Sequence, residues 1–156
     1  MREKRHPYVA YALLVIILGL TFLLSSQQGM NSHNLSINIC KKIVTFLNHN
    51  AKLSLDEKQY LNFIRFLDVP IRKAAHITEY AVLGIVLYVI VSAYIRSIWE
   101  RIVYVIVVIM LVGSLDEAHQ LYVLAREGKW QDVVIDVIGG CFGMAATIGL
   151  YRRNEL

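Results

Sequence analysis

Long apolar runs alternate with short polar or charged stretches along most of this chain. Four of these runs are long enough to be membrane-spanning helices: residues 8–24, 71–94, 98–115 and 132–150. A helix rises about 1.5 Å per residue, so each run covers most or all of a hydrocarbon core about 30 Å thick. The pattern predicts an all-α, polytopic membrane fold with four transmembrane helices.

The first apolar run, 8–24, shares features with a signal peptide, because Arg2, Lys4 and Arg5 precede it. However, the sequence Ser-Ser-Gln-Gln at 25–28 follows without a clear small-x-small cleavage pattern, and the run is long for a signal sequence. We therefore expect it to be retained as the first transmembrane helix.

The segment 31–67 is polar to amphipathic. Apolar side chains recur in it at helical spacing, at Ile37, Cys40, Ile43, Val44 and Leu47. The sequence at 54–57, Ser-Leu-Asp-Glu, has the form of a capping box and predicts a helix start just before Tyr60. Pro70 suits the first turn of the following helix, so we expect a break before it. We expect two short amphipathic helices in the membrane interface, with a soluble helical hairpin on the bundle end as the alternative.

Composition supports a membrane class. Of the 156 residues, 56% are hydrophobic and the mean hydropathy is +0.50, which is more apolar than a soluble domain of this length. The net charge of +4 could suggest nucleic acid, but many basic residues lie at the ends of apolar runs, where they anchor helices at the headgroups. We therefore expect no nucleic-acid partner. Cys40 and Cys141 differ too much in expected depth to form a disulfide.

Basic residues at the ends of the runs predict the orientation in the membrane. The basic amino-terminal residues, the turn containing Arg96 and Arg101, and the pair Arg152-Arg153 all fall on one side of a four-helix topology. Short basic segments stay in the cytoplasm, so we expect both termini to be cytoplasmic. Residues 25–70 and 116–131 are then expected on the outer side.

Ionisable residues gather at the predicted outer ends of the last three spans. Arg72, His76 and Glu79 are spaced i, i+4, i+7, which places them within about 60° of each other on one helix face. The other ionisable residues are Asp116, Glu117, His119, Arg126, Asp132 and Asp136, and the amide of Gln120 shares a helix face with Asp116. Charges near membrane depth face the bundle interior and find partners, so we expect the set to converge. Gly139 and Gly143 would let a neighbouring helix approach closely, within the chain or between chains.

Two interpretations of this set stay open, a structural ion network and a functional pocket, and we favour the pocket. Arg72 and Arg126 could clamp a phosphate or carboxylate, because the guanidinium fork matches two oxygens. A histidine beside a carboxylate can transfer a proton near neutral pH. His76, Glu79 and Glu117 could instead hold a divalent metal, although their spacing matches known ligand patterns only loosely. No nucleotide or hydrolase motif is present, and the cofactor is left open.

The same residues fall in three blocks that resemble the VanZ-like family of bacterial membrane proteins. The blocks are residues 72–84, residues 116–120 followed by Arg126, and residues 132–140 followed by Gly143. Ser-Ser-Gln at 25–27 is also similar to the family pattern, whereas Leu-Ala at 124–125 stands where the family often has Pro-Gly. The resemblance implies a bacterial cell-membrane protein with a part in low-level resistance to the glycopeptide teicoplanin.

Three functional hypotheses follow. The chain could bind teicoplanin or a lipid-linked cell-wall precursor at the outer leaflet, act as an enzyme on a phospholipid or lipid-linked phosphate, or serve as a structural scaffold. The first is favoured, because teicoplanin carries an acyl chain and acts at the outer membrane face. Candidate catalytic residues are His76, Glu79, Asp116, Glu117, His119 and Asp136. Candidate ligand-binding residues are Arg72, Gln120, Arg126 and Asp132, and the oligomeric state is left open.

Overall fold

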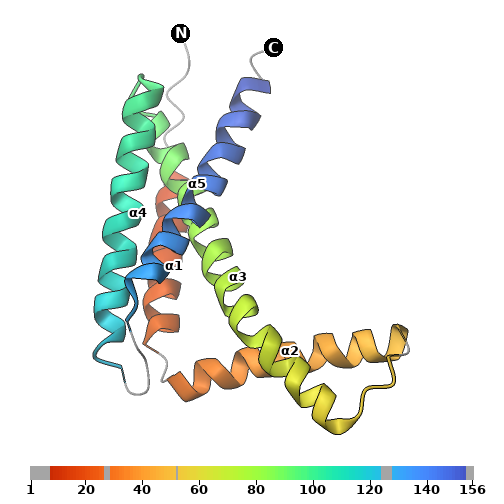
Figure 1. Cartoon of the computed structure of the whole chain (residues 1–156). Helices are drawn as coiled ribbons and strands as arrows, with labels where there is room; N and C mark the ends of the chain where they lie inside the picture. The colour runs from red at the N-terminus through yellow and green to blue at the C-terminus, as the bar shows by residue number, and fades with distance from the viewer. Residues whose placement is uncertain (1–7, 27–28, 52, 124–127, 154–156) are drawn as a thin grey trace.

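The computed structural model describes residues 8–26, 29–51, 53–123 and 128–153, with the backbone alone for 29–33. These residues form five helices: α1 (Tyr8–Ser25), α2 (Gly29–Asn50), α3 (Glu57–Ser92), α4 (Ile98–Gln120) and α5 (Trp130–Arg153) (Figure 1). All except α2 are long and apolar enough to cross a membrane. The predicted fold class, an all-α protein with four membrane-spanning helices, is therefore confirmed.

The four long helices form a bundle whose outer surface is apolar. Val9, Val15 and Phe22 of α1 and Leu115 of α4 are more than half exposed, although each is a large hydrophobic side chain. In water such a surface would be unfavourable, whereas in a bilayer the lipid chains cover it. The first turn of α1 and the last turn of α5 lie at the same end of the bundle (Figure 1), as four crossings require.

The break predicted at Pro70 is wrong, because Pro70 lies within helix α3. The helix runs without interruption through 36 residues and Pro70 lies inside it, so the expected short helix before the proline and the expected span 71–94 are one element. Proline removes one backbone hydrogen bond and costs about 3 kcal/mol in a helix interior. Contacts just before it offset this cost, because Ile64 and Asp68 are buried against α2.

The capping box before α3 is also not the one predicted. Asp56 is the N-cap, its carboxylate accepts from the Gln59 N–H at 2.7 Å, and the Gln59 side chain accepts from the Asp56 N–H at 3.0 Å. Ser54 lies outside the helix with a left-handed φ of 47°. The helix start before Tyr60 is correct, but the box is shifted by two residues because Asp caps a helix as well as Ser.

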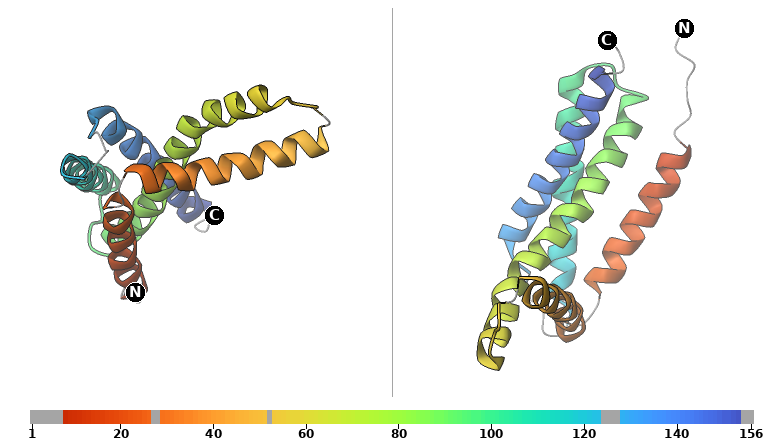
Figure 2. Two further views of the ribbon diagram at one scale, coloured as in Figure 1. Left: turned by 90° about the horizontal axis from the view of Figure 1, so that it is seen from below. Right: turned by 90° about the vertical axis from the view of Figure 1, so that its right-hand side faces the viewer.

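Helix α2 lies across one end of the bundle and runs alongside the first turns of α3 (Figure 2). Cys40 and Val44 of α2 and Ile64 of α3 form a separate buried cluster between the two. The region between the first two spans is therefore a helical hairpin, in which one arm is a single 22-residue helix and the other arm is the beginning of a span.

Helices α3 and α5 make the closest contact in the bundle, through glycines. A Cβ added at Gly143 would lie 1.9 Å from the carbonyl oxygen of Ala81, and one at Gly139 would lie 2.5 Å from that of Ile77. The small-residue stripe predicted from Gly139 and Gly143 is thus used within the chain. Around it pack the buried side chains of the main core, among them Tyr80, Leu83, Leu87, Val105, Ile109 and Met144.

Helices α4 and α5 are longer than the predicted spans 98–115 and 132–150. Helix α4 continues to Gln120, so Asp116 and its neighbours belong to the helix rather than to a polar connection. Helix α5 begins at Trp130 and ends at Arg153. At the end of α4, Asp116, Glu117 and Gln120 are buried in the protein, so these polar residues continue the helix instead of ending it.

Candidate functional site

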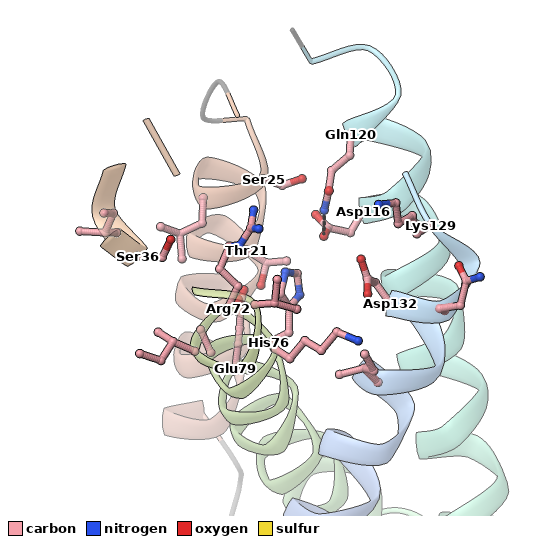
Figure 3. Close-up of a pocket in the computed structure, with 18 of the residues that line it drawn as sticks. Thr21, Ser25, Ser36, Arg72, His76, Glu79, Asp116, Gln120, Lys129 and Asp132 are labelled. Atoms are coloured by element: carbon pink, nitrogen blue, oxygen red, sulfur yellow. Dashed lines mark hydrogen bonds between the residues drawn. The ribbon is translucent and has the colours of Figure 1, made fainter. Parts of the chain in front are cut away.

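A pocket of about 1070 Å³ lies at the end of the bundle where α2 crosses it, and all five helices line it (Figure 3). Its polar lining comprises Thr21, Ser25, Ser36, Arg72, Lys73, His76, Glu79, Asp116, Gln120, Lys129, Gln131 and Asp132. Its apolar lining includes Leu24, Leu35, Ile39, Val69 and Ile135. The pocket therefore combines charged groups with hydrocarbon surface at one end of the membrane spans.

One face of α3 supplies the charged wall nearest α2. Arg72, His76 and Glu79 all line the pocket, as their i, i+4, i+7 spacing predicts. Arg72 Nη2 lies 3.2 Å from Oδ2 of Asp68 one turn earlier. The hydroxyl of Ser36 on α2 donates a hydrogen bond to the same carboxylate. Asp68 therefore holds the guanidinium at the pocket wall and ties α2 to α3.

His76 contacts the most deeply buried carboxylate of the site. Its Nδ1 lies 3.3 Å from Oδ1 of Asp136 on α5, and Asp136 is fully buried. The contact has the distance of an ion pair without the alignment of a hydrogen bond. Because Nδ1 faces Asp136, Nε2 is the ring nitrogen that remains for a bound molecule.

The pocket also carries buried polar atoms with hydrogen-bonding capacity left over. The Thr21 hydroxyl and the Glu79 carboxylate face each other, and among the described residues no other hydrogen-bond partner reaches them or the Ser25 hydroxyl. Figure 3 places these side chains on the α1 and α3 sides of the pocket. Buried polar groups are normally hydrogen-bonded, so this region is suited to a polar ligand group or to water.

The polar residues near the end of α4 face two different parts of the protein. Asp116 and Gln120 line the pocket, and Gln120 Nε2 donates to Oδ2 of Asp116 at 3.0 Å. Glu117 is buried but turns to the α4–α5 connection, where its Oε2 accepts from the Lys129 N–H at 2.7 Å. A Cβ at Gly128 would lie 2.5 Å from the Glu117 carbonyl oxygen, so the connection packs tightly here. Glu117 is thus placed to hold the connection and does not line the pocket.

His119 faces away from the pocket. Its Nε2 lies 3.0 Å from the hydroxyl oxygen of Ser26, and its ring lies 4.7 Å from that of Phe22, centroid to centroid. It therefore joins α4 to the end of α1. Of the remaining predicted residues, Asp132 lines the pocket, whereas Arg126 lies outside the residues that the structure describes.

Sequence reasoning missed several polar residues of the pocket. Lys73 follows Arg72 directly and lies three residues before His76, so helical spacing could have placed it on the same wall. Thr21 and Ser36 carried no such signal, because their participation depends on how α1 and α2 meet the bundle. Lys129 also lines the pocket beside Asp132.

The pocket lining mixes cations, carboxylates and neutral polar groups. Within the described ranges, no group of three His, Cys, Asp or Glu side chains is arranged to hold a metal. Three cationic side chains, Arg72, Lys73 and Lys129, share the pocket with the carboxylates of Asp116 and Asp132. Such a mixed lining can bind an anionic group and hydroxyl or amide groups at the same time.

Comparison with known proteins identifies the family. No curated protein and no solved structure matches the chain. A family profile described as VanZ/LLP1 matches residues 9–151, nearly the whole length of the chain. The match includes the three sequence blocks and every described residue that lines the pocket. This multi-pass membrane protein therefore belongs to the VanZ/LLP1 family.

Proposed function

We propose that this protein binds the headgroup of a membrane amphiphile, a lipid-linked cell-wall precursor or teicoplanin, and thereby takes part in glycopeptide resistance in a bacterial cell membrane. The observation that carries the proposal is the pocket at the end of the spans, where Arg72, Lys73 and Lys129 stand beside apolar side chains. An amphiphile needs both surfaces together, at the depth of its own headgroup.

The cations favour a phosphate-bearing ligand. Arg72 can present two parallel N–H groups to phosphate oxygens, and lysine ammonium groups add compact positive charge. The ion pair between Arg72 and Asp68 holds the guanidinium in place before a ligand arrives, which lowers the conformational entropy lost on binding. At about 1070 Å³ the pocket has room for a headgroup rather than for a single ion.

The carboxylates favour a headgroup that also carries hydrogen-bond donors. Glu79, Asp116 and Asp132 line the pocket opposite or beside the cations. Sugar hydroxyls, peptide amides and ammonium groups all donate to carboxylates. A cell-wall precursor combines such donors with phosphate on a lipid carrier, so it matches the mixed lining better than a simple phospholipid does.

The expected topology supports contact with the drug or with precursors. If the basic helix ends lie in the cytoplasm, the pocket lies on the outer side, where precursors are displayed and teicoplanin acts. The resemblance to VanZ-like proteins implies the same setting.

A second candidate is an enzyme that acts on a lipid-linked phosphate, and the contact between His76 and Asp136 favours it. A histidine whose Nδ1 faces a buried carboxylate is oriented as in general-base catalysis, with Nε2 directed at the reacting group. In this hypothesis His76 takes the proton of an attacking water or hydroxyl as its oxygen bonds to phosphorus. The P–O bond to the leaving group breaks, His76 returns the proton to the leaving oxygen, and Arg72 stabilises charge on the phosphate.

Teicoplanin susceptibility in a sensitive Gram-positive host tests the proposal. Cells would carry the intact chain or the Arg72→Ala, His76→Ala or Asp136→Asn variant, with membrane levels measured by immunoblot. Arg65→Ala is the matched control, because Arg65 is exposed on α3 outside the pocket. Protection lost in the pocket variants at normal protein level, and kept in Arg65→Ala, supports a working site. No protection from the intact chain would refute the resistance role.

A binding measurement separates the two candidates. Purified protein in nanodiscs would be titrated with a polyprenyl diphosphate, and the lipid recovered and analysed by mass spectrometry. A binding protein returns the lipid unchanged and loses affinity in Arg72→Ala. An enzyme returns a product, and His76→Ala stops product formation while the lipid still binds. A scaffold shows neither, and its pocket variants lower only the protein level.

A further inference from the structure

Helix α2 carries an exposed apolar stripe that its contact with α3 does not explain. Leu35, Ile39, Ile43 and Phe46 are 54%, 43%, 38% and 66% exposed. At 100° per residue they fall within an arc of about 80° on one side of the helix. Their side chains therefore form a continuous strip along α2, about 16 Å long at 1.5 Å per residue.

The other two sides of α2 are different in character. Ser36, Cys40 and Val44 are buried where α2 meets α3. Lys41 and Thr45 are exposed on the polar side, roughly 115° to 155° around the helix from the centre of the apolar stripe, and exposed Lys42 lies at the edge of the stripe, from where its long side chain can reach the headgroups. Such a division is typical of a helix that lies in a membrane interface, with charges in the water and apolar side chains in the leaflet.

The fold shows which way the stripe faces. Helix α2 crosses the end of the bundle in the left view of Figure 2 and is seen end-on there in the right view, and the pocket is lined by α2 together with the spans. Leu35 and Ile39 line that pocket, so their side of α2 faces the spans rather than the water. Ile43 and Phe46 continue the same stripe along α2 outside the pocket.

We propose that the apolar stripe of α2 rests in the hydrocarbon boundary of the leaflet and forms the lipid-side wall of the pocket. A ligand then reaches the pocket laterally from the leaflet, with its headgroup among the charged side chains and its chain along Leu35 and Ile39 in the lipid. The inference rests on the proposed binding function for the ligand, but the position of α2 is independent of it.

The physical reason is the cost of moving a chain through water. Each methylene exposed to water costs about 0.8 kcal/mol, so extraction of a long chain would cancel the gain from headgroup contacts. An apolar wall beside the charged groups lets the chain stay in lipid while the headgroup moves into the pocket. It also explains why α2 contributes Leu35 and Ile39 to a pocket in which α3 supplies cations.

The depth of α2 can be measured by tryptophan quenching with brominated lipids. Trp99 and Trp130 are exposed, so both can be replaced by phenylalanine to give a silent background. Phe46→Trp reports the stripe, and Lys41→Trp reports the polar face about 140° away. We expect quenching of Phe46→Trp at least about twofold stronger than that of Lys41→Trp, with quenchers near the headgroup end of the chain. Equal quenching, or stronger quenching at Lys41→Trp, would overturn the inference.

The lateral route can be tested with two ligands that share a headgroup. Farnesyl diphosphate in nanodiscs carries a chain, and inorganic pyrophosphate does not. Ile39→Asn should weaken farnesyl diphosphate binding about tenfold, equivalent to 1.4 kcal/mol, and leave pyrophosphate binding unchanged. Ile43→Asn is the control, because Ile43 continues the stripe without lining the pocket.

The outcomes distinguish the inference from the proposed function. If Ile39→Asn weakens both ligands equally, or neither, the chain does not lie along α2 and the lateral route is wrong. If the intact protein binds neither ligand, the proposed headgroup site is wrong and the lateral route falls with it, while the quenching result still decides where α2 lies.

Discussion

Replacement of Gly143 by alanine should push α3 and α5 apart and destabilise the whole bundle. The added Cβ would lie 1.9 Å from the Ala81 carbonyl oxygen and 2.7 Å from its carbonyl carbon. Both atoms belong to the backbone of a packed helix, so no side-chain rotation can relieve the contact. Ordinary contact distances would require the helices to separate by roughly 1.5 Å.

The expected magnitude comes from two opposing effects. Overpacking of a close-packed core costs about 1–3 kcal/mol. Alanine also favours a helix over glycine by up to about 1 kcal/mol. Gly149→Ala has the second effect alone, because Gly149 lies on the same helix and nothing is within 4 Å of its added Cβ. The difference between the two variants in free energy of unfolding should therefore be about 1–3 kcal/mol, with Gly143→Ala the less stable.

The measurement is reversible unfolding in mixed micelles of a mild detergent and dodecyl sulfate, followed by circular dichroism. Equal stability of the two variants, or a more stable Gly143→Ala, would refute the close approach of α3 and α5. Because His76 and Asp136 lie on these two helices, Gly143→Ala should also weaken ligand binding at the pocket. Gly149→Ala should leave binding as it is.

Three further predictions concern the hairpin of α2 and α3. Asp68→Ala should weaken the contact of α2 with α3 by about 1–3 kcal/mol, because the buried carboxylate links the two helices. Amide hydrogens of α2 should then exchange faster in Asp68→Ala than in an Asp56→Asn control. Equal exchange in the two variants would contradict this prediction. Pro70→Ala should raise the unfolding midpoint, because alanine restores the missing backbone N–H donor and stabilises the helix by up to about 3 kcal/mol. A lower midpoint would mean that the proline is needed for the course of the α3 backbone. Burial raises the pKa of the Cys40 thiol, so stability should fall as pH rises above the ordinary thiol value of about 8.5. In a Cys141→Ser background, maleimide should label Cys40 slowly until the protein unfolds, and equal rates before and after unfolding would speak against a buried thiol.

The spans and the α3 part of the pocket were predictable because they depend on local periodicity. An apolar run of about 20 residues has few alternatives to a membrane helix. Once residues 71–79 are helical, the geometry of the helix alone puts Arg72, His76 and Glu79 on one face. The convergence of three helix ends follows from the alternating topology, which brings Asp116, Gln120 and Asp132 to the same end as Arg72.

The break at Pro70 was predicted from local preference and is wrong because tertiary contacts outweigh it. Ile64 and Asp68 pack against α2 just before the proline, and these contacts exist only in the folded chain. The orientation of the His119 side chain also could not be predicted from the sequence. Its position on α4 permits several directions, and the place of α1 beside α4 decides that it meets Phe22 and Ser26.

The amino-acid sequence by itself determined that this protein has four membrane spans, that its ionisable residues gather at one end, and that one α3 face carries three of them. Only the tertiary structure decided that His76 meets Asp136, that Glu117 serves the α4–α5 connection, and that α2 supplies a wall of the pocket. The physical reason is the distance along the chain over which each interaction acts. Helix formation and lipid solvation act over neighbouring residues, whereas the register between α3 and α5 is set by glycines that let two distant backbones touch.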